Sequence, residues 1–227
     1  MFKNIEILDK EKFKGYKFDE VDVTDIAKNI GLVPLGFSEV WNAAHDCPVI
    51  ISSLERGEFL AFTGITNEIN IYKKENAYIP AFIRTYPFLS ADIKGENGNY
   101  NSLISIDNNS KYVSKKKKID IFTKDNELSK EANSKVEFIR EVNRQREISR
   151  KIVEELKEND LLVKKDFKVK ISETEEKIFL EEFYVVNIEK LIKLDDSIVA
   201  SWAKKGWMGI IDSHVKSLSN FQKVIQA

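Results

Sequence analysis

Hydrophobic and polar positions along the first half of this chain follow the pattern of β-strands. Short apolar segments rich in β-branched and aromatic residues are separated by polar turn residues, which is typical of strands. Two hairpins are expected, one closed by residues 53–57, with a positive φ angle at Gly57, and one closed by residues 63–67. The predicted strands are residues 5–8, 48–53, 58–63, 69–73, 88–93, 103–107 and 119–122.

One short helix is expected to interrupt these strands. Ser38 is placed to cap a helix over residues 39–46, and Glu39 is favourable at its positive end. Pro48 cannot continue a helix, so the next strand is predicted to begin there.

The period changes to that of a helix in the middle of the chain. Apolar residues recur at three- and four-residue spacings from Leu128 to Leu156, which predicts one long amphipathic helix from after Asn126 to about Asn159. The polar residues 143–147 interrupt its apolar stripe. We expect this turn to face solvent, and an edge, a kink or a polar partner are the alternatives.

The last third of the chain is predicted to hold a hairpin followed by helices. Alternating apolar and polar residues indicate strands at residues 161–171 and 177–186, with a bulge near Glu181 and Glu182. The predicted helices are residues 188–194 capped by Asn187, a stretch from Asp195 and Asp196 toward Lys204, and residues 207–225 after a break at Gly206.

Together these elements predict an α+β fold. The first half is mainly antiparallel β, followed by a long amphipathic helix, a β-hairpin and C-terminal helices. No internal repeat and no linker rich in proline, glycine or serine divides the chain, so a single domain over residues 1–227 is expected. The candidate sub-boundary is the polar stretch near residues 108–126.

We expect its lysine run, residues 115–118, to be a solvated hairpin tip rather than a contact for phosphate or an anionic polymer.

Composition excludes several classes of function. The 227 residues carry 36 Lys and Arg against 37 Asp and Glu, a formal net charge of -1, so no global field favours nucleic acid. The single Cys47 excludes an internal disulfide framework and a Cys-rich metal site. The sequence lacks a GxGxxG, P-loop, HExxH or GxSxG motif. We therefore expect no cofactor and no metal.

The N-terminal segment and the overall hydropathy bear on location. Charged residues recur throughout the first 18 positions, so the apolar core of a secretory signal is missing there. No window approaches the roughly 18 uncharged apolar residues of a membrane helix. A cytoplasmic protein without a transmembrane segment is expected, with surface association only through a partner or non-classical export.

A few side chains are candidates for chemistry or recognition. Arg84 can hold a carboxylate ligand, and pairing with Glu39 or a backbone carbonyl is the alternative. A Cys47–His214 dyad lacks an orienting partner, so no catalytic residue is assigned. Trp202 and Trp207 are either core residues or anchors of a protein-binding surface, and core is favoured.

Two blocks of sequence resemble the bacterial SapC family. The first is VPLGFSEVWNAAHDCPVII at residues 33–51, and the second, more specific one is YIPAFIRTYPFL at residues 78–89. The resemblance continues over most of the chain, through the long helix and the hairpin to a terminal helix that contains His214. It implies a role linked to a bacterial surface layer and assigns no reaction.

The proline and aromatic residues of these blocks also have a structural interpretation. Pro80 favours entry into a helix, and Pro87 pushes Tyr86 toward an extended backbone. We expect Tyr86 and Phe88 to be buried at a pivot between the β-rich half and the rest of the chain. The structural motif comprises Pro34, Pro48, Pro80, Tyr86, Pro87 and Phe88.

The sequence therefore favours a non-enzymatic interaction or assembly protein that binds another protein and not nucleic acid. The candidate binding residues are Glu39, Arg84, Trp202, Trp207 and His214. The alternative is an enzyme, or an enzyme accessory, that acts on peptide or surface-polymer side chains, with Arg84 as substrate anchor and Glu39 or His214 as acid or base.

Overall fold

The computed structural model groups the chain into two compact units. Residues 1–52, 55–65, 69–73, 76–94, 100–170 and 176–225 are described. Unit 1 consists of residues 1–26 and 81–144, and unit 2 consists of residues 27–80 and 145–227. The helices α1 (Val23–Ala27) and α4 (Lys130–Glu158) each contain residues of both units. Whether the chain folds as a single domain stays a prediction.

Unit 1 contains two small antiparallel sheets and the short helix α3, together with parts of α1 and α4. The first sheet has the order β1-β7-β6, formed by Ile5–Ile7, Tyr100–Asp107 and Phe88–Lys94. The second has the order β8-β2-β9, formed by Val113–Ser114, Lys17–Phe18 and Ile119–Asp120. The helix α3 is Ala81–Arg84. The core of this unit contains Phe13, Phe18, Phe88, Ile106, Val113, Ile121, Ala132 and Ile139.

Unit 2 is built on a five-stranded antiparallel sheet of order β10-β11-β4-β5-β3. Its strands are β3 (Leu32–Pro34), β4 (Val49–Ile51), β5 (Phe59–Phe62), β10 (Leu162–Lys170) and β11 (Glu176–Val186). A core cluster of Ile50, Phe183 and Val185 lies on this sheet.

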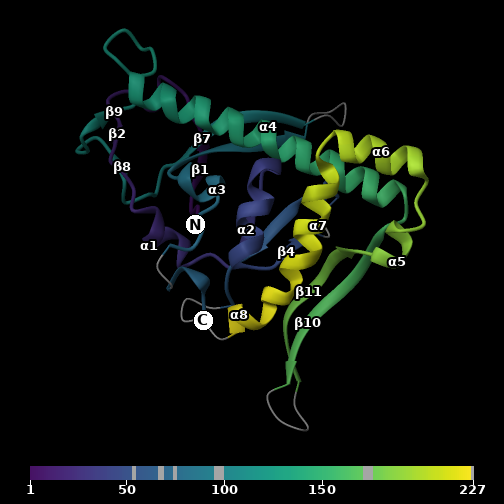
Figure 1. The fold of residues 1–227 in the computed structure, drawn as a ribbon. Coiled ribbons are helices and arrows are strands. Elements are labelled where there is room, and N and C mark those ends of the chain that lie inside the picture. The colour runs from purple at the N-terminus through teal and green to yellow at the C-terminus, as the bar shows by residue number, and fades with distance from the viewer. Residues whose placement is uncertain (53–54, 66–68, 74–75, 95–99, 171–175, 226–227) are drawn as a thin grey trace. The chain divides into compact units, whose positions relative to one another are not determined.

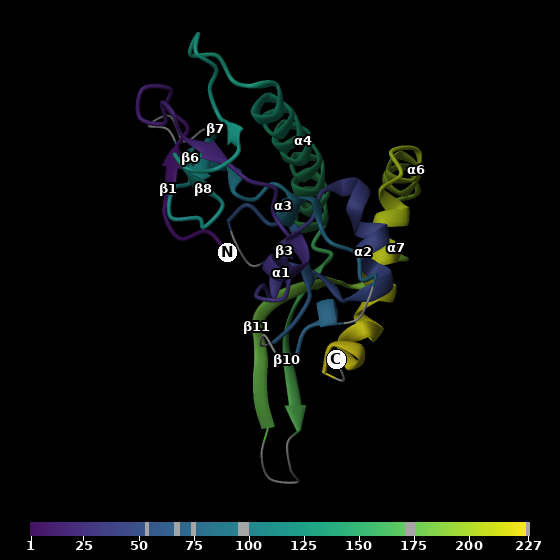
Figure 2. The same ribbon diagram turned by 90° about the vertical axis from the view of Figure 1, so that its left-hand side faces the viewer.

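Helices of unit 2 come from both ends of its sequence. Figures 1 and 2 both show α7 beside α2. The helical elements are η1 (Phe37–Glu39), α2 (Val40–Asp46), η2 (Ile71–Lys73), α5 (Ile188–Leu191), α6 (Asp196–Lys204), α7 (Trp207–Ser217), η3 (Leu218–Asn220) and α8 (Phe221–Ile225), where η marks a 3-10 helix.

The α+β fold predicted from the sequence is confirmed, including the long helix. The predicted terminal helix over residues 207–225 is divided into α7, η3 and α8, and α5 ends at Leu191. The Asn187 side chain accepts a hydrogen bond from Lys190 N at the start of α5. The Asp195 side chain does the same for Ser197 N at the start of α6. Gly206 separates α6 from α7 with a φ of 75°. The bulge is also found, with Glu182 at φ 56° and a shifted register opposite it.

Two local predictions in the first half were wrong. Residues 71–73 form a 3-10 helix instead of a strand, because the Asn70 Oδ1 atom accepts from Tyr72 N at 2.9 Å and stabilises a turn. Ser38 does not cap the helix. It lies inside η1, where Gly36 is the capping residue and Glu39 Oε2 accepts from Gly36 N at 3.1 Å.

The expected hairpin turns have different outcomes. Strands β4 and β5 pair as predicted, but the φ angle of Gly57 is not positive. Gly57 instead permits close packing, because an added Cβ would lie 2.6 Å from Val153 Cγ1 of α4. The tip of the second predicted hairpin falls partly on residues 66–68, outside the described residues.

The prediction for the polar turn of α4, residues 143–147, was wrong. We expected residues 143–147 to face solvent. Instead, the Arg146 side chain is buried against Glu58, and Gln145 Oε1 accepts from Ser38 N at 3.2 Å. The alternative of a polar partner is therefore the correct one.

Candidate functional site

Glu39, a predicted binding residue, is buried in unit 2. Only 6% of its surface is exposed, and its Oε1 atom accepts a hydrogen bond from the Tyr78 hydroxyl at 2.8 Å. Its other oxygen caps η1 at Gly36 N. The Tyr78 backbone N donates in turn to Asp46 Oδ2 at 2.8 Å. Glu39 therefore ties the start of η1 to the chain that follows η2.

His214 is also buried, and both ring nitrogens contact the backbone. Its Nδ1 atom lies 2.7 Å from Val49 O, and Val186 N donates to Nε2 at 3.2 Å. Since Nε2 is an acceptor, the proton sits on Nδ1 and is donated to Val49 O. Burial lowers the pKa of His214 to about 4, although the bond to Val49 opposes this shift. The imidazole is therefore neutral and links β4 to β11.

The thiol of Cys47 is equally unsuited to surface chemistry. Its exposed fraction is 2%, and its Sγ atom donates to Ala43 O at 3.4 Å. Burial raises the pKa of the Cys47 thiol above its ordinary value, with a smaller contribution from the nearby Asp46 charge. The reactive thiolate is disfavoured.

The two tryptophans considered as partner anchors are buried. Trp202 is 1% exposed, and its indole Nε1 donates to Glu155 of α4, while Trp207 is 8% exposed. Trp41 of α2, which the sequence reasoning missed, is 59% exposed and packs its ring against His45. The helical period gave the signal, because Val40 and Ala43 point inward and leave Trp41 outside.

Arg84 lies in unit 1, at the end of α3, and is exposed. Its guanidinium carbon sits 5.4 Å from the centroid of the Phe138 ring, a cation–π contact. It lines a shallow hollow of about 400 Å³ with Glu20, Glu131 and Lys135 among its neighbours.

The structural motif of prolines and aromatic residues is largely buried. The Tyr86–Pro87 peptide bond is cis, and the Tyr86 hydroxyl donates to Asp107 Oδ2 at 3.2 Å. Phe88 is fully buried, with its ring edge-on to Phe18. Pro48 and Pro80 are also buried, whereas Pro34 is partly exposed in β3. The role of this motif as a pivot stays a prediction.

The lysine run of residues 115–118 joins β8 to β9, both of which pair with β2. Lys117 forms an ion pair with Asp19 at 3.2 Å, and Lys118 N donates to Asp19 Oδ1. Lys115 lies 5.5 Å from the centroid of the Tyr16 ring. These contacts within unit 1 give the run a structural role.

One face of the sheet β1-β7-β6 carries four partly exposed aliphatic side chains beside the buried Ser105 and Asp107. Ile5 and Ile7 of β1 are about half exposed, at 49% and 51%. Leu103 of β7 and Ile93 of β6 follow on the same face at 38% and 43%, as the strand registers require. Clustered aliphatic side chains of this kind are typical of interaction surfaces.

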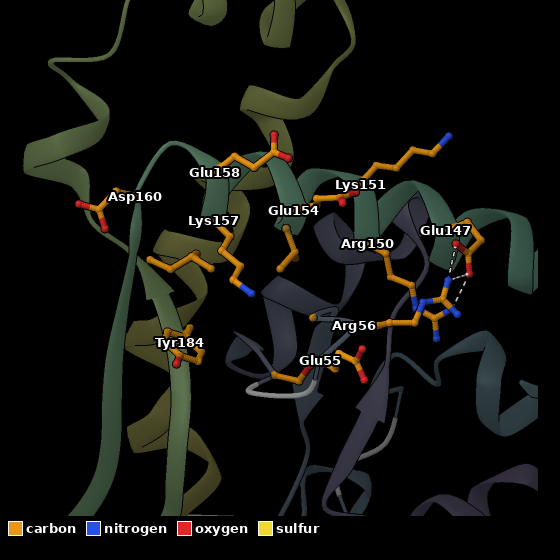
Figure 3. A pocket seen from close by; sticks show the side chains of 14 residues that line it. Glu55, Arg56, Glu147, Arg150, Lys151, Glu154, Lys157, Glu158, Asp160 and Tyr184 are labelled. Carbon is orange, nitrogen blue, oxygen red and sulfur yellow. Dashed lines mark hydrogen bonds and ion pairs between the residues drawn. The ribbon is translucent and has the colours of Figure 1, made fainter. Parts of the chain in front are cut away.

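A charged cleft of about 740 Å³ lies beside α4 in unit 2 (Figure 3). The second half of α4 forms one wall, and the turn between β4 and β5 forms another. The start of β10 and Tyr184 of β11 complete it. The charged lining residues are Glu55, Arg56, Glu147, Arg150, Lys151, Glu154, Lys157, Glu158 and Asp160.

A buried ion pair lies beneath this cleft. Glu58 is 4% exposed, and Arg146 donates to both of its carboxylate oxygens at 3.0–3.1 Å. Arg150 Nη2 approaches Glu58 Oε2 at 3.6 Å. The bidentate geometry fixes the first guanidinium and offsets the cost of burying both charges. Glu58 thus anchors two consecutive turns of α4.

The rim of the cleft holds a second carboxylate between two guanidinium groups. Arg56 Nη2 donates to both oxygens of Glu147 at 2.7 Å, and Arg150 Nη1 donates to Glu147 Oε1 (Figure 3). Lys157 points toward the middle of the cleft, whereas Lys151 points away from it. The cleft therefore combines fixed cations with several carboxylates.

Sequence reasoning did not find this cleft. Arg56 and Glu147 are 91 positions apart, and neither belongs to a recognisable motif. The only signal was the polar interruption of the α4 stripe at residues 143–147. None of the predicted binding residues Glu39, Arg84, Trp202, Trp207 and His214 lines it.

Comparison with known proteins gives one match. A family model described as SapC matches residues 8–224 of the 227 residues. No curated protein and no solved structure matches the chain. Among the described residues, no helix is both long and apolar enough to cross a membrane.

Proposed function

Because this chain belongs to the SapC family, we propose that it is a non-enzymatic interaction protein linked to the biogenesis of a bacterial surface layer. Its partner is another protein, and the charged cleft beside α4 is the surface that receives it. The observation that carries this proposal is the cleft itself, whose cations are held by ion pairs on a helix and a hairpin turn.

The cleft is suited to binding because its groups are already oriented. Arg150 is positioned by the buried Glu58, so little of its side-chain entropy is lost when a partner arrives. Its volume lies within the range of sites that take small ligands or short peptide segments, roughly 300 to 1,000 Å³.

The chemistry of the buried groups also favours binding over catalysis. His214 and Cys47 were the candidate base and nucleophile, and both lie inside unit 2 with backbone partners. A general base must reach a substrate proton, and a nucleophile needs its thiolate form. The partly exposed aliphatic side chains on β1, β7 and β6 add a second surface that suits a protein partner.

Capture with crosslinking tests this proposal. The protein is used as bait in extracts of its own cells, beside an Arg56→Glu/Lys157→Glu variant that reverses two cleft charges. The matched control, Lys10→Glu/Lys14→Glu, makes the same charge change at exposed positions of unit 1. We expect one protein to be captured by the wild type and the control, and at least about tenfold less by the cleft variant. Equal capture by all three would exclude the cleft as the docking site.

The enzyme alternative stays a prediction. Glu39 and His214 are each engaged in separate hydrogen bonds of unit 2, and Arg84 belongs to unit 1. Turnover of a peptide or surface polymer that is lost in Glu39→Gln, with the thermal midpoint unchanged, would reverse the ranking.

A further inference from the structure

The rim of the cleft already holds a carboxylate. Arg56 comes from the turn between β4 and β5, and Arg150 comes from α4, yet both guanidinium groups converge on Glu147. Guanidinium groups match the planar geometry of carboxylates, and two of them around one carboxylate form a specific recognition site.

The two sides of this arrangement are not equally fixed. Arg150 has 13% of its side chain exposed and is also held near the buried Glu58. Arg56 is 28% exposed, whereas Glu147 is 46% exposed and lies at the solvent edge. An exposed ion pair is worth little, because water screens it and two long side chains must be ordered. The cations are therefore better held than the carboxylate between them.

We propose that Arg56 and Arg150 form a clamp for the carboxylate of a peptide, which Glu147 occupies in the free protein and leaves when the peptide binds. This inference rests on the proposed function, since the peptide would be part of the partner protein. Glu147 then acts as an internal competitor.

The surroundings of the clamp favour a peptide carboxylate over a phosphate. The carboxylates of Glu55 and Glu154 line the same cleft and oppose a doubly charged anion more strongly than a singly charged one. Leu162 and Tyr184 supply apolar surface for the peptide chain beyond its carboxylate. The clamp and this surface together fit a short peptide with an acidic group.

A titration of four proteins tests the clamp. The probe is an N-acetylated alanine tripeptide with a free C-terminal carboxylate, followed by NMR chemical-shift changes. The proteins are the wild type, Glu147→Ala, Arg56→Gln and the control Glu141→Ala. The control removes an exposed glutamate of the same helix that also pairs with an arginine three residues later.

The clamp predicts opposite effects of the two cleft variants. Removal of the competitor in Glu147→Ala should tighten binding by up to about fivefold, the equivalent of one exposed ion pair. Arg56→Gln should weaken binding by about tenfold, because a charge-assisted hydrogen bond is lost. Glu141→Ala should bind as the wild type does. A thermal midpoint for each variant confirms that all four are folded.

Two further peptides distinguish a C-terminal carboxylate from a side-chain carboxylate. An amidated alanine tripeptide should not bind, and an amidated peptide with one glutamate tests a side-chain carboxylate as the ligand. The inference is wrong if Glu147→Ala fails to tighten binding, if the amidated tripeptide binds as well as the acid, if inorganic phosphate binds more tightly, or if no carboxylate peptide binds. Partner capture that depends on the cleft charges would still support the proposed function in those cases. Conversely, peptide binding without a captured protein would contradict the proposed function alone.

Discussion

The two ends of helix α4 are buried by different kinds of contact, apolar in unit 1 and partly ionic in unit 2. Within unit 1, the buried Ala132 and Ile139 of this helix lie in one apolar cluster with Phe88 and Ile106. Within unit 2, the helix buries the apolar Leu156 but also the charged and polar groups that precede it. There Arg146 pairs with Glu58, and the Ser149 hydroxyl donates to Leu35 O at 3.1 Å.

The packing of α4 in the two units depends on its buried residues in different ways. Apolar contacts are non-directional, so an aliphatic stripe accepts many partners of suitable volume. An ion pair below the surface accepts only a partner of opposite charge at hydrogen-bonding distance. The first half of α4 therefore tolerates many apolar residues of similar volume, whereas the second half requires particular charged residues.

The largest effect is expected for Phe88, which lies in the apolar cluster that the first half of α4 contacts. Phe88→Ala removes a fully buried ring and leaves a cavity beside Phe18, so the free energy of unfolding should fall by about 3 to 5 kcal/mol. Ile93→Ala on the same strand is the control, because Ile93 is 43% exposed and should cost less than about 1 kcal/mol. Urea unfolding measures both. An unchanged midpoint for Phe88→Ala, with partner capture lost, would make this block a recognition surface.

Substitution of Glu58 tests the ion pair that holds the second half of α4. Glu58→Gln keeps the shape of the side chain but leaves Arg146 without a carboxylate, which should cost about 3 kcal/mol of unfolding free energy. A Glu58→Leu/Arg146→Met double variant removes both charges and should recover much of that loss. If the single variant is as stable as the wild type in urea, the pair under the cleft does not hold α4.

Acid should also weaken unit 2 through His214. The pKa of this imidazole is lowered by burial to about 4 in the folded chain, below its ordinary 6.5. Below about pH 6.5 the unfolded chain binds a proton that the folded chain does not, so stability falls by up to about 3 kcal/mol as pH drops toward 4. The stability of His214→Gln should depend less on pH over this range. Parallel pH curves for wild type and His214→Gln would show that the histidine is not the cause.

The smallest effect is expected at the exposed rim. Arg56→Gln breaks a partly exposed pair with Glu147, so the loss of unfolding free energy should stay below about 1 kcal/mol. The thermal midpoint should therefore fall by no more than about 4 °C. A loss as large as that of Glu58→Gln would mean that rim and buried pair act as one structural unit, and the clamp would then have no freedom to exchange its occupant.

Elements with strong local signals were predictable. The period of α4, the alternation of β10 and β11, the cap at Asn187 and the helix start at Asp195 all follow from residues close in sequence, and each is found in the structure. Predictions failed where one side chain changed the local geometry. Asn70 is such a case, because its bond to Tyr72 N forms a turn where the apolar pattern favours a strand.

The candidate site could not be predicted in the same way. Arg56, Glu58, Arg146 and Glu147 look like ordinary surface residues in sequence, since their charges give no hint of partners 88 to 91 positions away. The family and the elements with a strong local pattern were predictable from the sequence, because periodicity, capping residues and short matching blocks depend on neighbouring residues. Only the tertiary structure decided which charges are buried and which remain at the rim, because ion pairing depends on the close approach of the β4–β5 turn to α4, permitted by Gly57.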